Sequence, residues 1–241
     1  MQYLGGKAYL RDEICAVINS IDAQIYVEPF CGACWVGEKV NKPHRVLSDA
    51  NYYLIEMWKA LQKGWIPPNV APSEEEYKRI RYDPTVSAEL KGFIGIAQSW
   101  GGIFWGGYAR GRKCNGEWRD YTRYAYNSTM RRIPNLLSVH FQHKLYSKVL
   151  SNSLKAKDPM VMYLDPPYES TARYRGIPPF NSKLFWQNVR VVSKKHYVLT
   201  SSYKAPEDFV KVREWNPRTG MNKGNNECLF AQGLVLENYD I

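Results

Sequence analysis

Residues 161–168, with the sequence VMYLDPPY, place the strongest constraint on how this chain can fold. The first four residues are apolar or aromatic and predict a short buried strand. Asp165 then precedes two prolines, which cannot donate hydrogen bonds to a sheet, so the chain must leave the sheet at this point. The segment therefore predicts a rigid turn at the carboxyl end of a strand, which is the edge where open α/β sheets bind ligands.

This turn has a composition that suits the activation of an aromatic exocyclic amine. The lone pair of such a nitrogen is delocalised into its ring, so the nitrogen is a poor nucleophile. The Asp165 carboxylate and the Pro166 carbonyl can accept its two N–H hydrogens and free the lone pair. Pro167 fixes the turn, and Tyr168 offers a face on which a flat base can stack. A loop that merely ends a strand, with Tyr168 as ordinary packing, is the alternative at this point, because short motifs also occur by chance.

Two other predicted strands also end in an acid. Residues 25–28 predict a strand that ends at Glu28 and Pro29, and Phe30, Gly32 and Ala33 follow it in a turn. A helix is expected from about residue 35 to 40, and residues 46–49 predict a second strand that ends at Asp49. An acid, a turn of small residues and a helix after a strand are typical of sheets that hold an adenosyl cofactor. The dinucleotide fingerprint G-x-G-x-x-G is absent, which suits a ligand without a pyrophosphate.

The N-terminus carries a short glycine-containing segment. Gly5 and Gly6 can let the backbone approach a ligand closely, while Lys7 supplies a cation beside it. The following apolar residues have helical spacing over residues 10–18. Taken alone, a Gly-Gly loop before a helix is usually only a loop.

Beyond residue 72 the alternation of strands and helices is lost, until about residue 158. Ser73 begins a predicted helix, and residues 100–132 interleave aromatic with basic side chains among glycines that predict a hairpin. Basic side chains that neutralise phosphates, together with aromatic rings that contact nucleobases, are typical of a nucleic-acid-binding insertion. The alternative is a basic loop region with its aromatics in a small core of its own. The side chains that we predict to contact nucleic acid are Tyr108, Arg110, Arg112, Lys113 and Arg123.

The rest of the chain returns to an α/β pattern. Residues 184–194 predict a helix, and residues 196–200, 209–215 and 227–232 predict strands.

The overall composition indicates what kind of partner the protein binds and in which cellular compartment it works. The net charge of +10 favours a polyanion, with nucleic acid ahead of an anionic membrane, although an unspecialised basic surface is the alternative. The five scattered cysteines and the lack of a signal peptide or an apolar span predict a cytoplasmic protein with free thiols. Cys31 and Cys34 lack a second Cys/His pair nearby, so we predict no metal site.

At this point the chain resembles the DNA adenine-N6 methyltransferases of the Dam type, the D12 class, in the alpha-group order of segments. The Gly-Gly-Lys segment comes first, then Glu-Pro-Phe-x-Gly-Ala at 28–33, then Asp49 with Asn51. An insertion follows, and then Asp-Pro-Pro-Tyr at 165–168. The resemblance covers essentially the whole chain. Two positions depart from the family pattern, because Tyr3 stands where the family often has Trp and Cys34 replaces a glycine.

The resemblance implies a fold and a domain organisation. It implies a Rossmann-like seven-stranded methyltransferase sheet formed by residues 1–63 and 159–241. Residues 64–158 would form an inserted, mainly helical target-recognition domain with a β-hairpin.

The same resemblance implies an activity. The enzyme would move a methyl group from S-adenosyl-L-methionine directly to N6 of a flipped-out adenine in duplex DNA, without a metal or a covalent enzyme intermediate. Asp165, Pro166, Pro167 and Tyr168 would be catalytic. We expect a monomer in a bacterial cytoplasm, or a phage-encoded one, acting alone or in restriction-modification. By the resemblance, the cofactor would be held by Tyr3, Gly5, Gly6, Lys7, Glu28, Pro29, Phe30, Gly32, Ala33, Asp49 and Asp165.

Two alternatives remain open on the sequence. The first is an amino-methyltransferase acting on cytosine N4 or on RNA, although cytosine-N4 enzymes more often carry Ser at the position of Asp165. The second is a catalytically inactive DNA-binding module of the same fold. The target sequence is not predicted.

Overall fold

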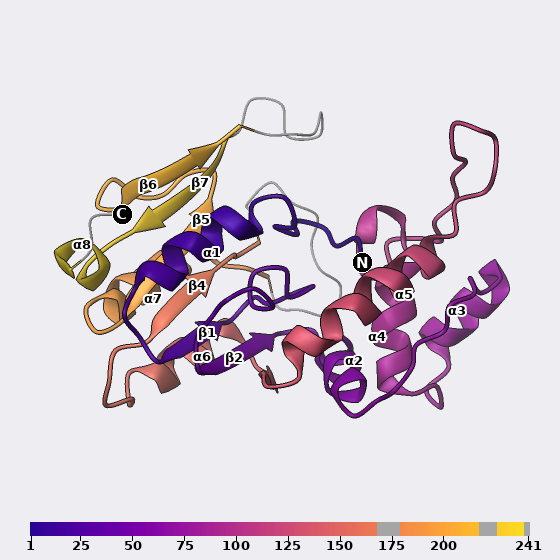
Figure 1. Cartoon of the computed structure of the whole chain (residues 1–241), viewed down its shortest axis with the longest axis horizontal. Helices are drawn as coiled ribbons and strands as arrows, with labels where there is room; N and C mark the ends of the chain where they lie inside the picture. The colour runs from indigo at the N-terminus through magenta and orange to yellow at the C-terminus, as the bar shows by residue number, and fades with distance from the viewer. Residues whose placement is uncertain (168–178, 217–225, 239–241) are drawn as a thin grey trace.

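A computed structural model describes residues 1–167, 179–216 and 226–238 of the 241-residue chain. Within these residues the strands form one seven-stranded sheet with helices on both faces (Figure 1). The predicted Rossmann-like α/β fold with a seven-stranded sheet is therefore confirmed. None of the helices in the described part of the chain combines the length and apolar character that a membrane span requires.

The strand order in the sheet is β3-β2-β1-β4-β5-β7-β6. Neighbouring strands are parallel except for β7, which runs antiparallel to both β5 and β6. The direction of the chain across the sheet reverses between β1 and β4, so their carboxyl ends meet at the position where α/β sheets bind ligands. The strands are β1 (Ile25–Glu28), β2 (His44–Asp49), β3 (His140–His143), β4 (Val161–Leu164), β5 (Tyr197–Ser202), β6 (Val210–Trp215) and β7 (Glu227–Ala231).

The two faces of the sheet bury separate apolar cores. Successive side chains of a strand point to opposite faces, so Val161 and Tyr163 of β4 face one core while Met162 and Leu164 face the other. The first core is closed by α1 (Arg11–Ser20) and α2 (Tyr52–Gln62), and the second by α6 (Tyr146–Ser153) and α7 (Ser182–Ser193). A short helix, α8 (Leu234–Asn238), follows β7. With both faces covered, the central strand β4 is apolar and buried throughout, as its sequence predicts.

A second group of helices extends from one end of the sheet: α3 (Glu74–Tyr82), α4 (Ala88–Ala97) and α5 (Tyr121–Arg132) (Figure 1). As predicted, Ser73 caps α3, and the Ser73 and Glu76 side chains each accept a hydrogen bond from the other's backbone N–H. Helix α4 lies against α2 so closely that a Cβ at Gly92 would be 2.1 Å from the carbonyl oxygen of Tyr53. The α2–α4 contact therefore joins this helical group to the sheet. The short 3-10 turns Trp100–Gly102 and Ile133–Leu136 flank this region.

The predicted helix at residues 35–40 is wrong, because the structure has only turns there. Cys34 adopts a left-handed φ of 57°, which ends any helical path into the segment. Gly37 packs where an added Cβ would meet Leu47 at 2.4 Å, so the segment is held by its contacts with β2.

The region between residues 64 and 158 also differs in part from the prediction. Strand β3 pairs with β2, and α6 contacts both β2 and α7, so both elements pack with the sheet. The expected hairpin is reduced to two isolated bridges in the described residues, Ser99 with Tyr108 and Arg112 with Trp118. The many glycines of this stretch leave few side chains to pair across the two strands.

Candidate active site

Asp165 lies directly after β4, at the reversal point of the sheet, and forms an ion pair with Lys7. The Lys7 Nζ is 2.6 Å from the Asp165 Oδ1 and 3.1 Å from the carbonyl oxygen of Gly5. A second carboxylate, Glu227 at the start of β7, approaches the same Nζ to 3.7 Å. The predicted N-terminal segment and the Asp-Pro-Pro turn therefore meet, although they are 158 residues apart.

Lys7 remains charged although it is buried. Burial alone would lower its pKa, but the charges of Asp165 and Glu227 outweigh burial and raise it. A buried ammonium needs such partners, since an unpaired charge away from water is costly. Lys7 therefore fixes the Asp165 side chain, which is only 17% exposed, in a defined position.

The two prolines follow the end of β4, so the chain leaves the sheet where the sequence predicts. Pro166 is buried and Pro167 half-buried at the end of β4. Tyr168 lies outside the described residues, so its stacking role stays a prediction.

Asp49 fixes the turn that follows β1. Its Oδ2 accepts the Gly32 N–H at 3.0 Å, and its Oδ1 accepts the Asn51 N–H at 2.8 Å. Burial raises the pKa of Asp49, while these backbone donors oppose the rise. The carboxylate at the end of β2 thus determines where Gly32 lies.

Glu28 is buried at the end of β1, with 3% of its surface exposed. Burial raises its pKa to about 8, and the nearby charges of Asp165 and Asp49 act in the same direction. The Tyr26 hydroxyl opposes the rise by donating to Glu28 Oε2 at 2.9 Å. Glu28 is therefore largely protonated at neutral pH and lies inside the protein beneath the turn.

Tyr3 packs directly against Gly32. Gly32 has a left-handed φ of 46°, and an added Cβ would lie 2.6 Å from ring carbon Cε1 of Tyr3. Gly6 makes a similar approach to Trp35, whose ring would be 3.1 Å from an added Cβ. The N-terminal segment thus lies on the turn after β1, which brings Tyr3, Gly6 and Gly32 together.

Phe30 lies apart from this group. Its ring stacks on Tyr146 of α6 at 5.2 Å between centroids and meets Phe185 of α7 edge-on at 6.1 Å. The residue therefore packs into the core on the opposite face of the sheet, next to buried Pro29. The Ala33 carbonyl oxygen accepts a hydrogen bond from Arg132 Nη2 at 2.6 Å.

Sequence reasoning missed three residues of this site: Glu227, Trp35 and Arg132. No local pattern marks Glu227, because its contact with Lys7 joins the two ends of the chain. Trp35 was assigned to a helix that does not form. Arg132 stands in the basic stretch, where its charge suggested only contact with nucleic acid.

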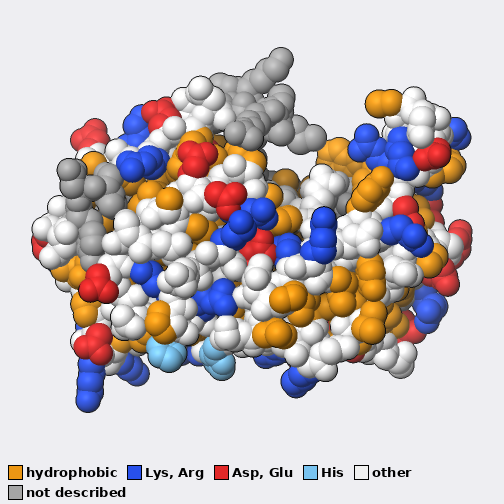
Figure 2. Space-filling model, viewed as in Figure 1, with side chains coloured by type: hydrophobic (Ala, Val, Ile, Leu, Met, Phe, Trp, Pro, Cys, Tyr) orange, Lys and Arg blue, Asp and Glu red, His pale blue; other side chains and the backbone are white. Residues whose placement is uncertain are grey.

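The predicted DNA-contacting side chains lie in the helical group, and all but Tyr108 have exposed ends. Arg110 is exposed and pairs with Glu74, and Arg112 is exposed with its guanidinium 4.5 Å from the centroid of the Trp118 ring. Tyr108 instead packs on Tyr77 and donates its hydroxyl hydrogen to the Pro72 carbonyl at 2.8 Å. Figure 2 shows blue side chains gathered on the segment that projects from this group, across a hollow from the sheet. Lys113 pairs with Glu117 at 2.7 Å, and Arg123 with Asp120 at 3.7 Å.

A cavity of about 530 Å³ lies beside this projecting segment. Its walls include the aromatic residues Tyr121 and Tyr124 and the basic residues Lys113 and Arg119. None of the residues of the Lys7–Asp165 group lines it. Within the described residues, no three His, Cys, Asp or Glu side chains lie close enough together to hold a metal ion.

Comparison with protein families supports the resemblance. Residues 3–101 match the family model of the D12 class N6 adenine-specific DNA methyltransferases. The matched range includes the N-terminal segment, the turn after β1 and Asp49, and ends before Asp165. The resemblance to this family is confirmed over these residues, which make up less than half of the chain.

Solved structures with a similar chain path are distant in sequence. Two structures of the rRNA methyltransferase aviRa from Streptomyces viridochromogenes align with a TM-score of 0.43 at 13% and 11% identity. The first alignment covers 97% of this chain and 86% of aviRa, and the second covers 95% and 85%. The Escherichia coli protein yhhF aligns with a TM-score of 0.37 at 12% identity, over 94% of this chain and 83% of yhhF. No curated protein matches the sequence. The seven-stranded sheet itself carries the assignment of the fold.

Proposed function

We propose that this chain, which matches the D12 class over residues 3–101, is a methyltransferase that transfers a methyl group from S-adenosyl-L-methionine to N6 of adenine in duplex DNA. The observation that carries the proposal is the ion pair between Lys7 and Asp165 at the reversal point of the sheet. It joins the predicted cofactor segment to the predicted catalytic turn.

The charges of the site suit a cationic cofactor. Three acidic residues lie on the same edge of the sheet: Asp49, Asp165 and Glu227. The Lys7 ammonium pairs with the last two of them. Excess negative charge attracts the sulfonium and ammonium groups of S-adenosyl-L-methionine. Gly32 has no side chain, which keeps the surface of the turn low beside the Tyr3 ring. The cofactor supplies an electrophilic methyl group when bound.

We assign the chain's part in the chemistry to the Asp165–Pro166 turn. The Asp165 carboxylate and the Pro166 carbonyl accept the two hydrogens of the target amine, which localises the lone pair on nitrogen. That lone pair would then be directed at the electrophilic methyl group that the bound cofactor would supply. The amine proton is lost afterwards, with Asp165 as its first acceptor. Lys7 positions the carboxylate for this task.

The helical group provides the proposed binding surface for DNA. Its exposed arginines would neutralise phosphates, and the hollow between this group and the sheet would accept the flipped base (Figure 2). Tyr108 is a supporting residue in this scheme, because its hydroxyl is bonded to the backbone of the helical group.

Transfer of tritium from labelled S-adenosyl-L-methionine, followed by nucleoside analysis, tests the proposal. Unmethylated duplex DNA and RNA of the same sequence would be offered in parallel. We expect label in N6-methyldeoxyadenosine from the DNA alone. Label on cytosine N4 or in RNA would overturn the substrate assignment, and no transfer to any of them would favour an inactive binding module.

A further inference from the structure

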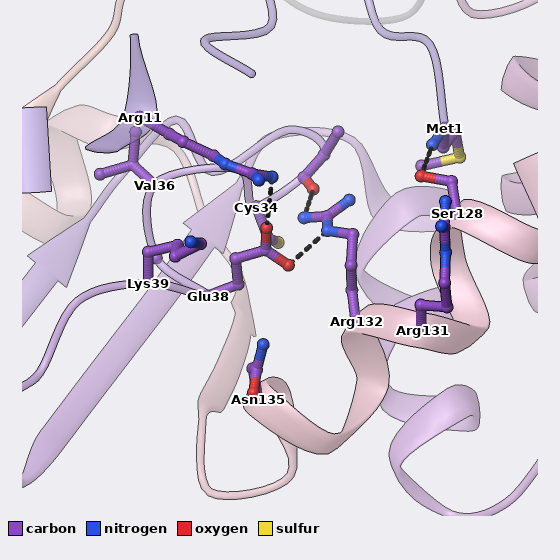
Figure 3. A network of polar contacts seen from close by, with 12 residues as sticks. Met1, Arg11, Cys34, Val36, Glu38, Lys39, Ser128, Arg131, Arg132 and Asn135 are labelled. Carbon is purple, nitrogen blue, oxygen red and sulfur yellow. Dashed lines mark hydrogen bonds and ion pairs between the residues drawn. The ribbon is translucent and has the colours of Figure 1, made fainter. Parts of the chain in front are cut away.

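Arg132 connects the helical group to the turn after β1. It is the last residue of α5, and 6% of its surface is exposed. Its Nη2 donates to the Ala33 carbonyl at 2.6 Å, and its Nε pairs with Glu38, which is also buried (Figure 3). The side chain thus bonds two points of the segment that runs from the turn, one on each side of Cys34.

The guanidinium also lies against the aromatic rings that support the turn. Its central carbon is 3.8 Å from the centroid of the Trp35 ring and 5.8 Å from that of Trp58. Trp58 in turn donates its Nε1 hydrogen to the Gly32 carbonyl at 3.1 Å, and Trp35 packs against Gly6. Arg132 therefore lies against the rings that support Gly32 and Gly6, two of the three glycines predicted to contact the cofactor.

Packing alone does not explain a charged side chain in this place. The Nη1 of Arg132 is buried and has no hydrogen-bond partner among the described residues, which costs free energy that an apolar side chain would avoid. Glu38 already has another basic partner, since Arg11 of α1 donates to its Oε1 at 3.1 Å. Arg11 belongs to the sheet side of the molecule, so the contact that is particular to Arg132 is the link to α5.

Helix α5 reaches from the proposed DNA surface to this link. Its buried face carries Thr122, Ala125, Thr129 and Arg132 at helical spacing, while Arg123 near its start is exposed. A helix transmits displacement along its axis because its backbone hydrogen bonds make it stiff. Helix α5 therefore connects Arg123 at its start rigidly to Arg132 at its end.

We propose that Arg132 is a positioning residue, which couples nucleic-acid contact on the helical group to the geometry of the cofactor turn. The coupling rests on the proposed function, whereas the positioning of the turn does not. Because coupling is reciprocal, cofactor binding strengthens DNA binding by the same factor as DNA strengthens cofactor binding.

The first test uses the protein without ligands. Arg132→Lys keeps the charge, but its ammonium cannot bond Glu38 and Ala33 and cover the flat Trp35 ring together. We expect faster amide hydrogen exchange over residues 29–39 in this variant than in the wild type. Arg11→Gln, which removes the other partner of Glu38, and the exposed neighbour Arg131→Gln should leave that exchange unchanged. Equal protection in Arg132→Lys, or equal loss in Arg11→Gln, would overturn the positioning role.

The second test measures coupling. Affinity for sinefungin, a cofactor analogue that transfers no methyl group, is measured by calorimetry with and without unmethylated duplex DNA. We expect DNA to tighten binding by roughly fivefold or more in the wild type and in Arg11→Gln, and by less than about twofold in Arg132→Lys. Full coupling in Arg132→Lys would overturn the proposal.

A double variant distinguishes loss of coupling from loss of the folded structure. Arg132→Met combined with Glu38→Gln removes both buried charges, so it should remain folded and should also lose the coupling. A double variant that couples as the wild type does would contradict the proposal. Failure of the wild type to bind sinefungin or DNA would count against the proposed function, while the exchange result decides the positioning role separately.

Discussion

Gly32 shows how one backbone position sets the shape of the cofactor turn. Its φ of 46° disfavours any residue with a Cβ, and the Tyr3 ring occupies the space that a Cβ would need. Both the backbone conformation and the lack of space for a Cβ therefore favour glycine at this position.

Gly32→Ala is expected to destabilise the protein and weaken cofactor binding, because the new methyl group displaces Tyr3. Gly64→Ala is the matched control, since Gly64 also has a positive φ, 88°, but no atom lies within 4 Å of the added Cβ. The control should lose only the conformational term, about 1–2 kcal/mol, and bind sinefungin normally. Urea unfolding and calorimetry measure both effects, and equal behaviour of the two variants would refute the role of the Tyr3 contact.

The buried carboxyl of Glu28 makes stability depend on pH. Its folded pKa of about 8 lies above its ordinary value of 4.5, so the folded state binds the proton more tightly than the unfolded state does. This stabilisation is complete below pH 4.5 and is lost as the pH rises to about 8, with a slope of at most about 1.4 kcal/mol per pH unit.

Glu28→Gln should remove this slope, because the amide resembles the protonated acid and does not titrate. The free energy of unfolding, measured in urea at a series of pH values, should favour the variant increasingly between pH 4.5 and 8. Glu75→Gln, an exposed position in α3, serves as the control and should keep the wild-type slope. Parallel curves for the wild type and Glu28→Gln would exclude a raised pKa at this residue.

At the scale of elements, the predicted strands β1, β2, β4 and β5 all form, because each is a run of apolar residues ended by a proline or polar turn. Strand β3 was missed, since His140–His143 is short and mostly polar, and only its pairing with β2 makes it a strand. The helix expected at residues 35–40 does not form, because contacts with the turn and with β2 determine the conformations of Cys34 and Gly37. Tertiary contacts decide such short segments, and a single sequence does not display them.

The helical group gives a prediction about salt. If Arg110, Arg112 and Arg123 contact phosphates, each Arg→Gln change should reduce the slope of log K against log [salt] for duplex DNA by roughly one. Lys194→Gln is the control, because Lys194 is exposed after α7, at the opposite edge of the sheet from Asp165. Fluorescence anisotropy at several salt concentrations provides the slopes. Slopes that stay at the wild-type value in the arginine variants would show that the DNA path lies elsewhere.

At the scale of the whole molecule, the order of segments predicted which strand ends would meet. Lys7, Gly32, Asp49 and Asp165 were all expected at one site, and the structure gathers them at the edge formed by β1, β2 and β4. The contribution of Glu227 was not predictable, because it depends on β7 entering the sheet antiparallel beside β5. Arg132 likewise has its role only once α5 is placed against the turn.

The most direct test of the account is single-turnover methyl transfer by Asp165→Ala beside Asp158→Ala. Both residues flank β4, but Asp158 is exposed before the strand begins, at the other edge of the sheet. In Asp165→Ala the Lys7 ammonium keeps Glu227 as a partner, so the fold and the affinity for DNA should be retained. We predict that Asp165→Ala loses transfer by about 100-fold or more, while Asp158→Ala matches the wild type. Wild-type transfer by Asp165→Ala would contradict the central claim that this carboxylate activates the target amine.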